Sequence, residues 1–352
     1  MHTCRKWRHL VFASQGVLRL RLFCTHGTPV QKNLDCWPAL PIVVQYGGLP
    51  TPEDEDNIMA ALKRPDRVIS ICLTITTSLL EKLFTIKGAL SELQDLLLSR
   101  DGVPLTLPST FRWSQRLRRL HMTGIALPTL PHLLTSSTDL IDLQFHDVFL
   151  PWQFPPKTFM EVLSKLGQLR SLSLHFSSTA DYHHSLLPYL EGISLPVLTT
   201  LNYRGSMAYL EGIVAMIDAP LLVGIEITFF DHPVLALSKL NNFINQIDIY
   251  RSHCGAHMFS SEPTISISLI QPEAPMFLKL EALCKPLRRI QISSIVQICL
   301  KFSPFLFDNK GNPCDSTTRQ SEWMNSSHSR ELLELLIGLF TGKGCFTSIR
   351  TT

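Results

Sequence analysis

The chain has 352 residues, of which 45% are hydrophobic and 17% are charged, and its formal net charge is +3. This composition excludes disorder over most of the length and allows one large domain or two ordinary ones. The near-neutral balance gives no reason to expect nucleic acid or a membrane as a partner, and no run of ~18 apolar residues could span a bilayer. We therefore expect a cytoplasmic or nuclear protein.

The cysteines and the N-terminal segment give weaker indications. The nine cysteines are scattered and never form a Cys-x-x-Cys pair. This spacing favours reduced thiols over a disulfide framework or a zinc site. Residues 1–34 are basic and contain no acidic residue, as in a mitochondrial presequence, but they are also patterned like folded structure, which is the interpretation we favour.

The first part of the chain is predicted to contain short strands and one helix. Apolar and β-branched residues predict strands over Leu18–Leu22, Pro41–Tyr46 and Val68–Leu73. A helix is predicted over Glu53–Leu62, because Thr51 and a proline precede three acidic residues in its first turn.

The central part carries a six-residue phrase, apolar-x-x-apolar-x-apolar. It begins at Leu93, Leu117, Leu140, Leu169, Leu198 and Leu222, at intervals of 24, 23, 29, 29 and 24 residues. Leucine-rich repeats have a period of roughly 20–29 residues. The last two apolar residues of each phrase point the same way from a short strand, so neighbouring strands must stack to bury them.

The segments between the phrases are partly helical in pattern. Pro156–Leu166 and Met207–Ile217 each present one apolar stripe at helical spacing, and Gly167 ends the first of them. We therefore predict an α/β fold, an irregular leucine-rich-repeat solenoid with parallel strands on one face and helices and loops on the other. The asparagine or cysteine that usually follows each phrase is missing.

Beyond Phe230 the pattern changes. A helix is predicted over Leu235–Ile247, and strands over Thr264–Ile270 and Phe277–Glu281. Residues 287–302 are ambiguous, since their first part matches the repeat phrase and their second part fits a helix.

The C-terminal residues predict two further elements. A polar flexible loop is expected over residues 308–329, and an amphipathic helix over residues 330–340. We interpret this helix as a cap over the last apolar face rather than as a docking peptide.

Several segments carry a further likeness, which spans roughly residues 1–300: Cys4–Phe12, Leu22–Val30, Trp37–Val44, Asp139–Leu143 and Ile217–Leu222. They resemble the F-box and leucine-rich-repeat proteins that are expanded in mushroom-forming fungi. The resemblance implies a substrate receptor of a ubiquitin ligase, in which the F-box docks on a Skp1-type adaptor and the repeats hold a protein substrate.

The same resemblance implies a division of the chain. Residues 1–16 correspond to the last F-box helix, with Trp7 and Leu10 as the adaptor-binding remnant. Residues 17–300 form the leucine-rich-repeat-like domain, and residues 301–352 form a divergent C-terminal segment. The first two F-box helices have no counterpart, so an adaptor interface of normal size is not expected.

The candidate binding residues are the x positions of the central strands, because solenoids use such side chains for recognition rather than for the core. Their mixed charges favour a specific protein partner, with arginines as anchors. Arginines do not recur at equivalent positions of successive phrases, so nucleic acid is not expected. The candidates are Arg118, Arg119, His121, Asp142, Gln144, Arg170, Ser173, Asn202 and Glu226.

Motifs for catalysis are missing from the sequence. It contains no phosphate-binding loop, no nucleophile elbow and no His-Glu-x-x-His, and the pair His183 and His184 is interpreted as a surface loop rather than a metal site. We predict no enzymatic activity, no cofactor and no metal. Three hypotheses remain: a ubiquitin-ligase substrate receptor, an adaptor-independent scaffold or degenerate paralogue with no ligase role, and an enzyme built on a solenoid.

Overall fold

A computed structural model describes residues 10, 13, 18–37, 39–84, 90–100, 105–106, 114–126, 134–148, 156–176, 192–229, 238–247, 255–261, 264–270 and 277–283. The chain divides into two compact units, one of Met1–Ala180 with Ile193–Leu198 and one of Asp181–Gly192 with Thr199–Thr352. The sequence predicted a single repeat domain over 17–300, and its boundaries stay a prediction. The expectations for Trp7, for His183 and His184, and for residues 287–340 lie outside the described residues.

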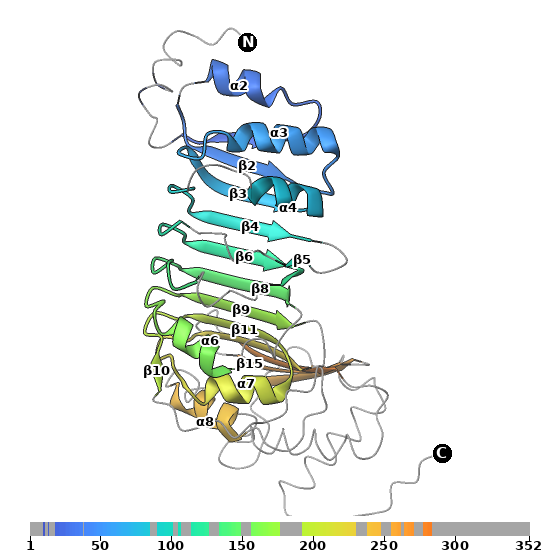
Figure 1. Cartoon of the computed structure of the whole chain (residues 1–352). Helices are drawn as coiled ribbons and strands as arrows, with labels where there is room; N and C mark the ends of the chain where they lie inside the picture. Colours follow the sequence, from blue (N-terminus) through green and yellow to red (C-terminus); the bar gives the residue numbers. More distant parts are fainter. Residues whose placement is uncertain are drawn as a thin grey trace, which may run out of the picture. The chain divides into compact units, whose positions relative to one another are not determined.

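The first unit is built on a parallel sheet whose strands follow one another in chain order (Figure 1). Its strands are β1 (Leu20–Phe23), β2 (Ile42–Tyr46), β3 (Val68–Thr74), β4 (Asp95–Ser99), β6 (Arg119–Thr123), β8 (Asp142–Val148) and β9 (Ser171–Phe176). Each strand pairs in parallel with the next. Short strands β5 (Leu105–Thr106) and β7 (Ile125–Ala126) pair in parallel, and β10 (Ile193–Ser194) also belongs to this unit.

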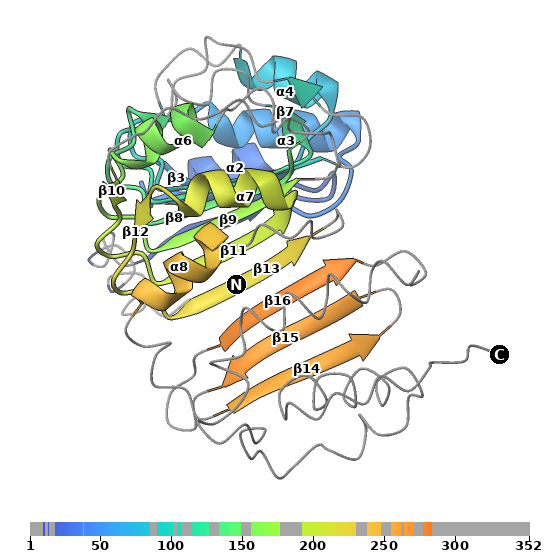
Figure 2. The same cartoon turned by 90° about the horizontal axis from the view of Figure 1, so that it is seen from below.

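The helices of this unit return the chain from one strand to the next. They are α2 (Val30–Cys36), α3 (Pro52–Leu62), α4 (Thr77–Phe84) and α6 (Pro156–Leu163). Figure 2 shows α3, α4 and α6 on the same side of the strands. The predicted helix at Glu53–Leu62 is confirmed as α3, which begins with a capping box between Thr51 and Asp54. Helix α6 ends at Leu163, three residues before the predicted end.

The repeated phrase has the same structure at each of its six occurrences. Its eighteen apolar residues are all between 0 and 3% exposed. In each phrase the N–H of the first apolar residue donates to the carbonyl oxygen three residues earlier, at 3.0–3.3 Å. Every phrase therefore enters its strand through the same turn, and its apolar residues form the core.

Two serine hydroxyls link the turns that precede three successive phrases, at the other end of the strands from the missing asparagine or cysteine. The hydroxyl of Ser114 donates to the carbonyl of Ser91 at 2.8 Å, and the hydroxyl of Ser137 donates to the carbonyl of Ser114 at 3.4 Å. Both donors lie at or below 5% exposure, so these bonds satisfy buried groups in successive turns.

The second unit combines parallel and antiparallel strands. Its elements are β11 (Thr200–Gly205), α7 (Met207–Val214), β12 (Ile217–Asp218), β13 (Gly224–Phe229), α8 (Ser238–Gln246), β14 (Gly255–Ser261), β15 (Thr264–Ile270) and β16 (Phe277–Leu283). Strands β11, β13 and β16 pair in parallel, whereas β15 is antiparallel to both β16 and β14. Only two residues separate β14 from β15, which is too short for the crossover that parallel strands need. Both units have α/β folds. The sequence predicted parallel strands throughout, and this prediction is wrong for β15, which is antiparallel to both of its neighbours.

Candidate functional site

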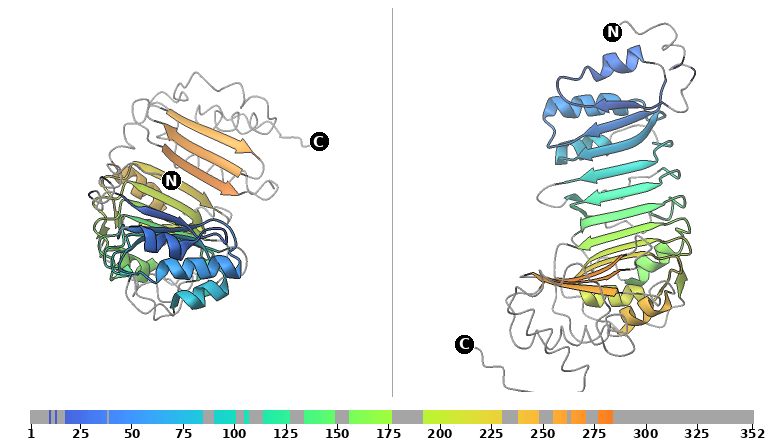
Figure 3. Two further views of the ribbon diagram at one scale, coloured as in Figure 1. Left: turned by 90° about the horizontal axis from the view of Figure 1, so that it is seen from above. Right: turned by 180° about the vertical axis from the view of Figure 1, so that it is seen from behind.

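The sheet of the first unit has a second face, on the side away from α3, α4 and α6, and the right view of Figure 3 looks at this side of the strands. Side chains alternate along each strand, so residues next to the buried leucines share the opposite face. We call this set the polar face. Its rows, from β3 to β9, are Ser70, Asp95, Arg119, Asp142 and Ser171, then Cys72, Leu97, His121, Gln144 and Ser173, and then Thr74, Ser99, Thr123 and His146.

A cavity of about 420 Å³ lies where these strands begin, and we call it the arginine hollow. It is lined by Arg19, Arg118, Arg119 and Arg170, by Asp95 and Asp142, and by Gln94, Ile141 and Ser171. The hollow therefore combines four guanidinium groups with two carboxylates around one half-buried isoleucine.

The backbone ladder explains why residues from separate phrases converge here. Gln94, Arg118, Ile141 and Arg170 each directly follow the leading leucine of a phrase. The N–H of Arg118 donates to the carbonyl of Gln94 at 2.7 Å, and the N–H of Ile141 donates to the carbonyl of Arg118 at 2.8 Å. The N–H of Arg170 continues the ladder to the carbonyl of Ile141 at 2.8 Å. These bonds place the four residues side by side on consecutive strands, and we call each such position a rung.

The charges of the hollow are unevenly paired. Arg119 donates to both carboxylate oxygens of Asp95, each at 2.7 Å. These bonds raise the pKa of Arg119, and the charges of Asp95 and Asp142 act in the same direction. Asp142 accepts from the amide of Gln144 at 3.1 Å. The exposed side chain of Arg118 makes no hydrogen bond or ion pair among the described residues.

Three histidines from neighbouring strands, His121, His146 and His175, lie in contact with one another near the other end of these strands. The rings of His146 and His175 stack with centroids 4.1 Å apart, and His121 meets His146 edge-on at 4.8 Å. Ser173 lies between the first two, with its Oγ 3.1 Å from Nε2 of His146 and 3.4 Å from Nε2 of His175. Burial, and then the charges of His175 and His121, lower the pKa of His146 to about 4. Burial also lowers the pKa of His121.

Few other groups in the described part of the chain could act as nucleophiles or metal ligands. Burial, followed by the charge of Asp54, raises the pKa of the Cys24 thiol to about 12, so it stays protonated. Within the described ranges, no three His, Cys, Asp or Glu side chains are grouped so that they could hold a metal ion. None of the described helices has the length and apolar character needed to cross a membrane.

The structure brings together most of the residues predicted from the sequence. Arg118, Arg119, Asp142 and Arg170 line the hollow, while His121 and Gln144 lie in the middle row. Ser173 is only 3% exposed and holds the histidines instead of facing solvent. Asn202 and Glu226 are register partners in β11 and β13 of the second unit. Leu10 is 50% exposed.

The charged and imidazole side chains of this surface that the sequence interpretation missed include Arg19, Asp95, His146 and His175. A signal existed for the two histidines, because each directly follows the last apolar residue of its phrase. Asp95 and Arg119 also occupy the same position of successive phrases, which predicts their pairing once the strands are known to be in register.

Comparison of the chain with protein-family models, with curated proteins and with solved structures found no match. Inference about its function therefore rests on the fold and on the side chains of the polar face.

Proposed function

We propose that the chain is a protein-binding repeat protein, an irregular leucine-rich-repeat solenoid whose polar face receives one partner protein. The observation that supports this most directly is that each phrase separates core residues from residues on the opposite face of the sheet. All eighteen apolar residues are buried, whereas the residues that alternate with them along the strands form ordered, mostly polar rows on the opposite face of the sheet. Solenoids use such surfaces for recognition.

The composition of the rows favours protein over other ligands. Carboxylates, amides, imidazoles and guanidiniums alternate across neighbouring strands, which suits a partner of mixed chemistry. A surface for nucleic acid would need cations at successive rungs to follow the phosphates.

A catalytic role is not part of this proposal. Ser173 and His146 are within hydrogen-bonding distance, as a nucleophile and its base would be. However, Ser173 is 3% exposed, and a pKa of about 4 makes His146 a weak base. A serine that substrate cannot reach, beside a weak base, does not suit nucleophilic catalysis.

The proposal can be tested by capturing partners from cells that express the tagged chain. The variant Arg118→Glu with Gln144→Arg changes the arginine hollow and the adjoining polar face, and it leaves the Arg119–Asp95 pair in place. Its matched control is Lys165→Glu with Gln168→Arg, two exposed residues that follow α6. Partners retained by the control and lost from the face variant, with equal thermal unfolding, support the proposal. Identical partner sets from both variants contradict it.

A narrower function follows from the resemblance of Cys4–Phe12 to the end of an F-box. We propose that the chain acts as a substrate receptor joined to a Skp1-type adaptor, with the exposed Leu10 among the contacts. Co-purification with such an adaptor, reduced by Leu10→Asp and unchanged by Lys165→Glu, supports this function. Failure of the adaptor to co-purify removes it and leaves an adaptor-independent scaffold.

A further inference from the structure

The arginine hollow carries more positive charge than its own carboxylates can balance. Four arginines and two aspartates line it. Asp95 is already bound by Arg119 through two hydrogen bonds of 2.7 Å. The side chain of Arg118 is exposed and makes no hydrogen bond or ion pair among the described residues, although Arg118 lines the same cavity. Arginine binds carboxylates through paired, nearly parallel hydrogen bonds, and the hollow already contains one such pair.

We propose that the arginine hollow binds an acidic segment of a partner protein, in which a glutamate or aspartate pairs with Arg118. This inference rests on the proposed function and names the chemistry of the partner at that site. An exposed guanidinium group without a carboxylate partner, as at Arg118, attracts carboxylates at long range and selects an acidic segment over a basic one.

The spacing of the rungs favours separate carboxylates over a single phosphate. Arg118 precedes β6 and Arg170 precedes β9, with Ile141 on the rung between them. Neighbouring strands lie about 4.8 Å apart, so the Cα atoms of the two arginines are roughly 10 Å apart. This is close to the ~9.3 Å between residues i and i+3 of a peptide in the polyproline II conformation, whose side chains point to the same side. Two acidic residues with that spacing would each meet one arginine, and the two residues between them would pass over Ile141.

Fluorescence polarisation with labelled peptides tests the inference. The probe peptide has glutamate at every third position and alanine or serine elsewhere. One companion peptide carries glutamine in place of glutamate, and another carries a single phosphoserine and no glutamate. We expect the glutamine peptide to bind about tenfold more weakly or worse, and the affinity for the probe to fall as salt rises from about 0.05 M to 0.3 M.

Variants locate the binding. Arg118→Glu and the milder Arg118→Gln should both weaken binding of the glutamate peptide, the first by about tenfold or more. The control Lys165→Glu makes the same charge change outside the hollow and should alter the affinity by less than about twofold. Thermal unfolding of each variant shows whether the fold is retained, and Arg118→Gln keeps the test informative if the charge reversal unfolds.

Three results would overturn the inference: equal binding of the glutamine peptide, unchanged binding by both Arg118 variants, or tighter binding of the phosphoserine peptide than of the glutamate peptide. The proposed function fails separately. If partner capture depends on the polar face but no acidic peptide binds, only this inference is lost. If capture is indifferent to the polar face, the proposed function itself is contradicted.

Discussion

Gly124 ends β6 in a backbone conformation that other residues rarely adopt. Its φ is +68°, and a Cβ atom added there would collide with the carbonyl oxygen of Arg100. Its N–H also donates to the carbonyl of His146 at 2.9 Å, so the backbone cannot move freely away. We expect Gly124→Ala to lower the free energy of unfolding by about 1–3 kcal/mol, measured by urea denaturation.

Gly167 provides the matched control for this substitution. No atom lies within 4 Å of a Cβ placed there, and its φ is not in the left-handed region. Gly167→Ala should therefore change the unfolding free energy by less than about 0.5 kcal/mol. Equal losses for the two variants would show that the clash at Arg100 is relieved by a small shift.

Individual residues of the polar face were predictable only where the phrase marks their position. Arg118 and Asp142 occupy x positions and were found, but Arg19 precedes β1, where the phrase is degraded. Its approach to the hollow depends on how the sheet arranges strands that are distant in sequence. Ser173 was predicted to be exposed because it occupies an x position, but it is buried, since the imidazole rings of His146 and His175 pack against it.

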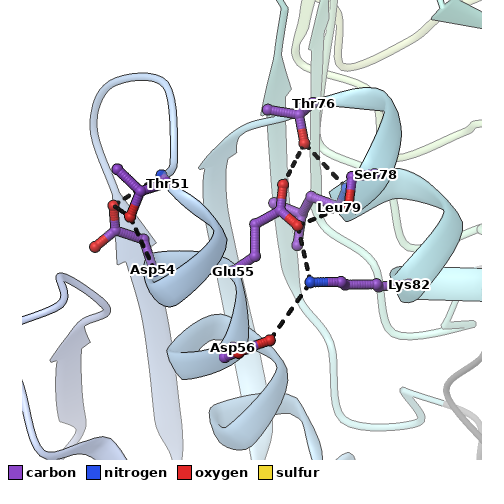
Figure 4. A network of polar contacts seen from close by, with 8 residues as sticks. All are labelled: Thr51, Asp54, Glu55, Asp56, Thr76, Ser78, Leu79 and Lys82. Carbon is purple, nitrogen blue, oxygen red and sulfur yellow. Dashed lines mark hydrogen bonds and ion pairs between the residues drawn. The ribbon is translucent and has the colours of Figure 1, made fainter.

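At the scale of elements, buried glutamates join successive helices. Glu55 of α3 accepts hydrogen bonds from the hydroxyls of Thr76 at 2.6 Å and Ser78 at 2.9 Å, at the start of α4, and pairs with Lys82 (Figure 4). Burial raises the pKa of Glu55, but these bonds together outweigh it, so the net pKa is lowered and the carboxylate stays charged. In the second unit, Glu211 of α7 accepts from the N–H groups of Lys239 and Leu240 in α8.

This arrangement predicts that Glu55 holds α4 in place. Glu55→Ala leaves two hydroxyls and an ammonium without their shared acceptor, and we expect a loss of about 1–3 kcal/mol in thermal or urea unfolding. Glu53→Ala removes an exposed acid from the first turn of the same helix and should cost less than about 1 kcal/mol. A larger effect at Glu53 than at Glu55 would contradict the buried network.

The helices and strands that could be predicted from the sequence are those with a regular residue pattern. The central strands follow from the spacing of the phrases, and α3 follows from its capping box. Helices α2 and α4 have seven and eight residues, too few turns to establish a helical period in the sequence. Strand β14 has no clear alternation in its sequence, and its pairing with β15 depends on the short connection between them.

At the scale of the whole molecule, the stacked core can be tested at its centre. Leu143 is fully buried and is the register partner of Leu120 and Leu172 on either side. We expect Leu143→Asp to cost several kcal/mol, about 4 or more, because it buries an unpaired charge. Thr123→Asp, on the polar face of neighbouring β6, should cost less than about 1 kcal/mol. A melting temperature that barely moves for Leu143→Asp would remove this residue from the core.

The histidine row predicts how stability depends on pH. The pKa of His146 is about 4 in the folded chain, below the value of about 6.5 expected when unfolded. As pH falls, the unfolded chain therefore binds a proton first, and folding stability that is complete above pH 6.5 is lost progressively towards pH 4. His121 acts in the same sense, since its pKa is also lowered, while the charge of Asp142 opposes this. Because His146 is partly exposed, we expect the loss to be about 1–2 kcal/mol, less than the full shift implies.

Urea unfolding at about pH 7.5 and at about pH 5 measures this dependence. His146→Asn removes the titrating ring nearest both neighbours and should flatten the profile, while His121 keeps part of the slope. The control Gln168→Asn replaces an exposed residue that carries no titrating group and should leave the slope as it was. Equal slopes for the parent and His146→Asn would show that the stacked rings accept protons as readily as free histidine, and stability that rises as the solution is acidified from pH 7.5 to 5 would show that they accept protons more readily. The polar face would then gain charge near neutral pH, and acid would strengthen rather than weaken its attraction for an acidic segment.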